Sequence, residues 1–105
     1  MDARVLAAAA NNARWCDLVC RSHALPTVLS GERWLAPAGS PRFYPDAVTL
    51  APGLPADAVL RGIDSRPGSS VKDSFADVEL GDDGFAVLSG GGALRVVVDM
   101  PASTR

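Results

Sequence analysis

The chain has 105 residues and a mass of 10.9 kDa, the size of a single domain. With 48% hydrophobic and 21% charged residues, its composition is typical of a globular protein and argues against a disordered one. Eight prolines and ten glycines, together above the usual share of ~12%, exclude a bundle of long continuous helices. Two cysteines are too few for a disulfide scaffold, and no run of ~18 apolar residues predicts a membrane span.

The charge balance is slightly acidic, with a formal net charge of −2. A domain that binds duplex nucleic acid carries a clustered basic face, and the sequence has no such cluster, so we expect no nucleic-acid partner. The apolar N-terminal stretch ends at Asn11 and lacks the basic start of a secretory signal. Cys16 and Cys20 lie four residues apart, which suits one helix face better than a disulfide. We therefore expect a cytoplasmic protein.

Residues 3–22 are predicted to form a helix. The segment is rich in Ala, the strongest helix former, and Asp2 can cap its start, whereas Pro26 forbids its continuation. Its apolar residues recur three or four positions apart, with Asn12 as the only polar interruption of that face. These positions are Val5, Ala8, Ala9, Trp15, Cys16, Val19 and Cys20.

Residues 23–45 are predicted to be an irregular but ordered loop. Prolines and glycines punctuate the segment, yet it also contains Leu29, Trp34, Leu35, Phe43 and Tyr44, which a solvated linker would not carry. Long ordered loops in compact domains often have a function, so this loop is the first place to look for a ligand.

Residues 46–100 are predicted to follow the order β-α-β-β-β. A short strand at 47–50 precedes a helix at 55–63, and strands at 70–80, 85–88 and 94–100 are separated by glycine-containing turns. Together with the first helix, this order predicts an α+β fold, with the helices on one face of a small, mainly antiparallel sheet.

Two groups of side chains are candidate sites. Cys16, Cys20 and His23 are spaced for one helical face and are residue types that bind zinc, but the sequence holds no fourth Cys or His. The same Cys and His side chains are also candidates for a nucleophile pair, and buried Cys can equally be a core residue. The second group comprises Trp34, Phe43, Tyr44 and Asp46, which could line a small-ligand pocket or simply close one side of the sheet.

Two further motifs favour structural interpretations. Gly90-Gly91-Gly92 precedes a β-branched run instead of the helix that a phosphate loop requires, so a hairpin turn is expected there. Ser69 lies three residues before Lys72, but that spacing falls on a predicted strand and not on the helical turn of a catalytic Ser-x-x-Lys motif. We therefore assign no catalytic residue.

Four segments carry a resemblance to a known family. They are residues 12–17 (NARWCD), 23–26 (HALP), 43–50 (FYPDAVTL) and 70–76 (SVKDSFA). In these segments the chain resembles the N-terminal region of uncharacterised actinobacterial proteins related to GNAT-type N-acetyltransferases. The resemblance implies part of an acyl-CoA N-acyltransferase-like sheet. The family's acetyl-CoA loop, an Arg/Gln-x-x-Gly-x-Gly/Ala segment that opens a helix, does not occur here, and the resemblance ends near Leu88.

The leading hypothesis is a non-catalytic α+β binding or interaction module without a resident cofactor. Its expected partners are a small molecule and a second copy of the chain, paired through an open sheet edge. The alternatives are an acyltransferase-like protein that uses acetyl-CoA, and a metal or redox sensor built on the Cys/His group.

Overall fold

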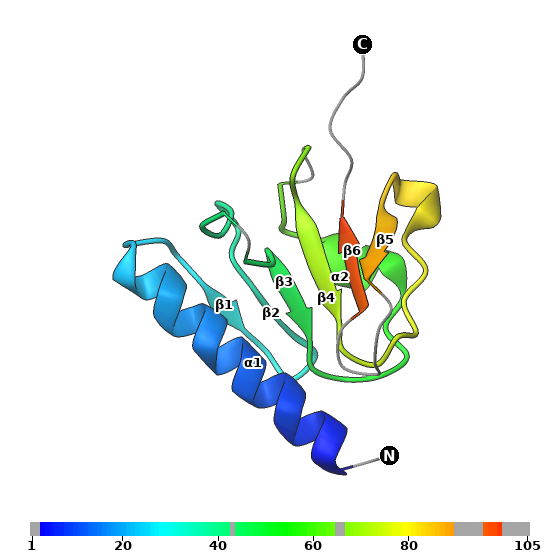
Figure 1. Ribbon diagram of the computed structural model, residues 1–105, viewed down its shortest axis with the longest axis horizontal. Coiled ribbons are helices and arrows are strands. Elements are labelled where there is room, and N and C mark those ends of the chain that lie inside the picture. Colours follow the sequence, from blue (N-terminus) through cyan, green and yellow to red (C-terminus); the bar gives the residue numbers. More distant parts are fainter. Residues whose placement is uncertain (1–2, 43, 65–66, 90–95, 100–105) are drawn as a thin grey trace.

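A computed structural model describes residues 3–42, 44–64, 67–89 and 96–99 of the chain. Figure 1 shows the helices and strands in this part of the chain. In order, the elements are α1 (Ala3–Ser22), β1 (Val28–Leu29), β2 (Arg33–Leu35), β3 (Ala47–Thr49), α2 (Ala56–Leu60), β4 (Ser70–Asp73), the 3₁₀ helix η1 (Gly81–Asp83), β5 (Ala86–Ser89) and β6 (Val96–Asp99).

The strands form one mixed sheet in the order β1-β2-β3-β4-β6-β5. β3 and β4 run parallel and are connected through α2, whereas the other neighbouring strands pair antiparallel. A parallel pair needs a crossover connection, and α2 provides it. The α+β class and the mainly antiparallel sheet are confirmed.

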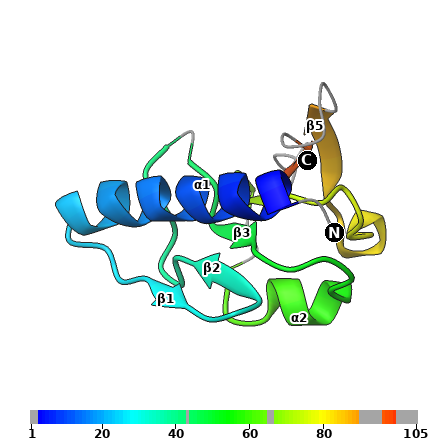
Figure 2. The ribbon, with the colours of Figure 1, turned by 90° about the horizontal axis from the view of Figure 1, so that it is seen from below.

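The two helices lie on opposite faces of the sheet, as Figure 2 shows. Side chains of a strand alternate between its faces, so Trp34 and Val48 pack with α1, whereas Leu35, Ala47 and Val71 belong to a separate cluster on the side of α2. The prediction that both helices share one face was therefore wrong. Both faces of the central strands are apolar, so one helix packs on each face.

The boundaries of α1 match the prediction. Ala9, Ala13, Cys16 and Cys20 are its buried residues, at the three- and four-residue spacing of a single face. The helix ends where Ala24 adopts a left-handed backbone conformation, with φ of 57°, and the Leu25 amide donates back to the Cys20 carbonyl.

The predicted loop at 23–45 was wrong over its first half, because β1 and β2 form there. The Ser30 amide donates to the Arg33 carbonyl at 2.9 Å and closes the tight turn between these two strands. Strands of two and three residues carry too few side chains to show an alternating pattern.

The predicted elements at 47–50, 55–63 and 70–80 are longer than the observed ones, whereas β5 has the predicted length and is shifted by one residue. The strand predicted at 70–80 ends at Asp73, whose carboxylate accepts hydrogen bonds from the amides of Asp77 (3.2 Å) and Val78 (2.9 Å) and turns the chain. The helix predicted at 55–63 is reduced to α2, because Arg61 is extended and Gly62 has φ of 90°. The turn predicted at Gly90-Gly91-Gly92 lies outside the described residues.

Candidate ligand-binding site

Two hollows flank α1 where it crosses the sheet. The first has a volume of about 260 Å³, and its lining residues are Asn12, Trp15, Cys16, Tyr44, Pro45, Ser70 and Lys72. The second has a volume of about 220 Å³, and its lining residues are Ala10, Ala13, Arg14, Asp17, Leu29, Trp34 and Leu50. We refer to them as the Lys72 hollow and the Trp34 hollow.

Three separate segments build the Lys72 hollow. Asn12, Trp15 and Cys16 lie three and four positions apart and so share one side of α1. Ser70 and Lys72 alternate along β4 and therefore face the same side of the sheet. The remaining wall comes from the segment before β3, through Tyr44 and Pro45. The hollow exists only when α1 is packed on the sheet.

Asn12 supplies an unused hydrogen-bond donor at this site. Its amide nitrogen Nδ2 is buried and has no hydrogen-bond partner among the described residues. A buried polar group without a partner costs ~1–3 kcal/mol, so native proteins rarely leave one unless a ligand or water satisfies it. Lys72, half-buried, is the one charged residue of the lining. Asn12 and Lys72 thus line the same small space.

Asp46, predicted to bind ligand, braces the wall of the Lys72 hollow instead of lining it. The side chain is buried, and its two oxygens accept the amides of Ser40 (2.9 Å) and Ser70 (3.3 Å). The Asp46 amide also donates to the Ser70 carbonyl at 2.8 Å. These bonds fasten the segment that carries Tyr44 and Pro45 to the start of β4.

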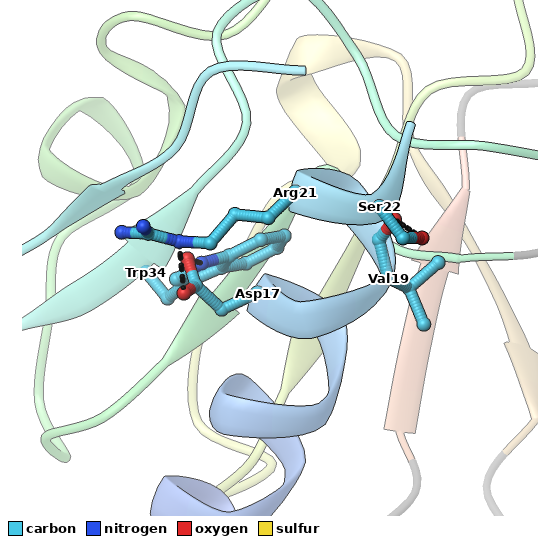
Figure 3. Close-up of polar contacts among 5 residues, drawn as sticks. All are labelled: Asp17, Val19, Arg21, Ser22 and Trp34. Atoms are coloured by element: carbon cyan, nitrogen blue, oxygen red, sulfur yellow. Dashed lines mark hydrogen bonds and ion pairs between the residues drawn. The ribbon is translucent and has the colours of Figure 1, made fainter. Parts of the chain in front are cut away.

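Trp34, also predicted to bind ligand, is a core residue of the other side of α1. It is only 1% exposed, and its indole Nε1 donates to Asp17 Oδ1 at 3.0 Å (Figure 3). It borders the Trp34 hollow, whereas Tyr44 borders the Lys72 hollow. Phe43 lies outside the described residues. The predicted aromatic pocket is therefore divided by the helix.

The carboxylate of the Trp34 hollow, Asp17, is already engaged in internal contacts. Hydrogen bonds from Thr27 and Trp34, together with the Arg21 guanidinium, hold the pKa of Asp17 below its usual value. The Asp17–Arg21 pair is 2.7 Å long. This carboxylate has its donors within the chain, in contrast to the amide of Asn12.

Cys16, Cys20 and His23 are not brought together as ligands. Both thiols are free and buried in the core under α1, whereas His23 is exposed beyond the end of the helix. No group of three or more His, Cys, Asp or Glu side chains that could hold a metal ion occurs in the part of the chain that the structure describes. Burial raises the pKa of Cys16 to about 11, against a partly opposing effect of the Lys72 charge. A protonated thiol is a poor nucleophile and a poor metal ligand.

Ser69 likewise has a structural role. The residue is buried, and its hydroxyl donates to the Asp64 carbonyl at 2.7 Å, just before β4 begins. This agrees with the structural interpretation of the Ser69–Lys72 spacing.

Asn12, Trp15, Ser70 and Lys72 were not predicted as site residues. For Asn12 a signal existed, because it is the one polar interruption of an otherwise apolar helix face. Lys72 is the single lysine of the chain, which marks it only weakly. The meeting of these residues depends on contacts between segments far apart in the sequence.

No family model, curated protein or solved structure matches the chain. The resemblance to GNAT-related proteins therefore stays a prediction. Neither helix in the described part of the chain has the length and apolar character needed to cross a bilayer.

Proposed function

We propose that this protein is a non-catalytic module that binds a small molecule in the Lys72 hollow. The observation that carries the proposal is that Asn12, whose buried Nδ2 has no partner among the described residues, lines a hollow of about 260 Å³. Ligand pockets typically measure ~300–1,000 Å³, so the occupant is at the small end of the range. A few polar groups on mainly apolar walls are the usual composition of such sites.

The lining favours binding over catalysis. General acid–base chemistry needs a group that exchanges protons near the working pH, most often His, Glu or Asp. None of the described residues that line the hollow is a His, Glu or Asp. The Cys16 thiol, with a pKa of about 11, is protonated at neutral pH and is therefore a poor nucleophile.

The test is a fragment screen followed through the amide NMR spectrum. Binders should shift the amide signals of Asn12, Trp15 and Lys72. Ser70→Leu, which fills the hollow from β4, should abolish these shifts. Leu29→Phe, which narrows the Trp34 hollow, should leave them unchanged.

A screen in which no fragment shifts the three signals at millimolar concentration would overturn the proposal. Acetyl-CoA belongs among the probes, because it is the ligand that the family resemblance implies.

We also propose that two copies of the chain pair through the β1 edge of the sheet. Val28 and Leu29 on this edge are 48% and 72% exposed, and an edge strand with apolar side chains is a template for another strand. Light scattering should give a dimer mass, and Leu29→Lys should convert it to the monomer. Val87→Lys on β5, at the opposite edge, is the matched control. A wild-type monomer at high micromolar concentration would contradict this pairing.

A further inference from the structure

We propose that the Lys72 hollow selects a small organic monocarboxylate, with the carboxylate held between Lys72 and Asn12 and an apolar or aromatic body against Trp15 and Tyr44. This inference rests on the proposed function and narrows the ligand to a chemical class.

The charge of the lining favours an anion. Among the described residues that line the hollow, Lys72 is the only charged one. The whole chain carries a net charge of −2, so it does not attract anions in general. The positive charge of Lys72 therefore attracts an anion only at short range, once the anion has entered the hollow. In a half-buried position its attraction for an anion exceeds that of a fully solvated lysine.

The donor set suits a carboxylate better than a phosphate. The Asn12 amide offers N–H to one oxygen and the Lys72 ammonium can meet the other, which matches the two oxygens of a carboxylate. Phosphate sites add the free N–H groups of a helix N-terminus or an Arg fork. Asn12 is the tenth residue of α1, where backbone N–H groups are bonded within the helix, and no Arg is among the described residues that line this hollow.

The other walls fit an apolar body. Trp15 is 57% exposed although it borders the hollow, so one face of a large indole is open to a ligand. Tyr44, Pro45 and Cys16 add further carbon and sulfur surface. Aromatic side chains stack on flat ligands and supply contact area at little conformational cost. A small carboxylic acid with a flat or branched body thus matches both the polar side of the hollow, at Lys72 and Asn12, and its apolar side, at Trp15 and Tyr44.

The experiment compares probes of one shape that differ in charge. Phenylacetate and phenylacetamide are titrated against the wild-type protein by NMR, with inorganic phosphate as a third probe. We expect phenylacetate to bind at least about tenfold more tightly than the amide, as expected when a charge-assisted hydrogen bond is available to only one of them. Lys72→Met should remove this preference and keep the weak binding of phenylacetamide.

Two further variants keep the test independent of any loss of stability in Lys72→Met. Asn12→Leu should weaken phenylacetate binding about tenfold while α1 is retained, because Leu is a good helix former. Lys72→Arg keeps the charge and should retain the preference for the acid. Arg14→Met, which removes a cation beside the Trp34 hollow, is the matched control and should change nothing.

The outcomes separate the inference from the proposed function. Equal affinity for phenylacetate and phenylacetamide would overturn the carboxylate class and leave a binding hollow in place. Phosphate that binds more tightly than phenylacetate would also overturn it. Absence of binding by all probes and by the fragment screen would remove the proposed function itself.

Discussion

The indole Nε1 of Trp34 donates a hydrogen bond of 3.0 Å to Asp17 Oδ1, which joins the centre of β2 to α1 (Figure 3). The ring lies in the same buried cluster as Ala13, Cys16 and Val48. Arg21 binds the other oxygen of Asp17 from one helical turn away. This contact fixes where α1 lies over the sheet, and the position of α1 shapes both hollows.

Trp34→Phe tests the contribution of this bond to stability. Phe keeps an aromatic ring in the core but loses the N–H group and part of the ring volume. We expect the free energy of unfolding to fall by about 1–3 kcal/mol, from the lost hydrogen bond and the space left behind. Urea unfolding followed by circular dichroism measures it. Trp15→Phe on the exposed side of the helix should cost less than about 0.5 kcal/mol, and equal losses in the two variants would contradict the interpretation.

Asp17 should make stability depend on pH in the acid range. Its pKa is lowered in the folded protein, mainly by the hydrogen bond from Thr27 and then by that from Trp34. The unfolded chain therefore binds the proton first as the pH falls, so the stabilisation is complete above the ordinary carboxyl pKa of ~3.9 and is lost as the pH drops through the folded pKa.

Asp17→Asn isolates this effect, because Asn retains an acceptor for Trp34 but has no charge. At neutral pH we expect it to be less stable than the wild type by less than about 1 kcal/mol, since solvent screens the partly exposed carboxylate. The difference should shrink below about pH 4. Unfolding curves of both proteins between neutral and acid pH provide the measurement, and a difference that grows on acidification would refute the assigned direction.

Cys16 should be nearly inert towards thiol reagents in the folded protein. A rise of the pKa from 9.0 to about 11 lowers the thiolate fraction at neutral pH about 100-fold, and burial of the sulfur slows access further. Iodoacetamide labelling of native Cys20→Ala, which leaves Cys16 as the single thiol, should be at least about 100-fold slower than labelling in denaturant. Rapid labelling of the native variant would show that the thiol is ionised or exposed.

The sequence predicts those parts of the fold that depend on local interactions. The alanine-rich segment with a regular apolar spacing forms α1 over the predicted residues. β1 and β2 could not be predicted, because strands of two and three residues are too short to show an alternating pattern, and β2 depends on pairing with β3 further along the chain. β4 ends at Asp73 because its carboxylate accepts hydrogen bonds from the amides of Asp77 and Val78. These bonds hold the chain in a turn and take the place of further pairing between strands.

The site could be predicted less well than the fold, for a related reason. Tyr44 borders a hollow, whereas Trp34 is buried in the core, so the role of an aromatic residue depends on which side of α1 it meets. That Asn12 and Lys72 line the same hollow follows from the packing of α1 on the sheet. A polar residue on an apolar helix face is the one local sign that a sequence can offer for such a site.

Asp46 should control both the stability of the domain and the affinity of the Lys72 hollow. Its carboxylate accepts two amides, so Asp46→Asn keeps one acceptor and turns an NH₂ group towards a donor. We expect a loss of about 1–3 kcal/mol in the free energy of unfolding, because a buried donor is left without its partner.

The same substitution should loosen the segment that carries Tyr44 and Pro45, and so weaken phenylacetate binding without removing any group that touches the ligand. Asp83→Asn, an exposed change at the last residue of η1, is the matched control for charge and should alter neither quantity. Chemical denaturation and NMR titration of the two variants give the comparison. If Asp46→Asn lowered stability but left the affinity unchanged, the wall would be held by its backbone bonds alone, since the Asp46 amide and carbonyl still pair with Ser70 and Ala36 at 2.8 Å each.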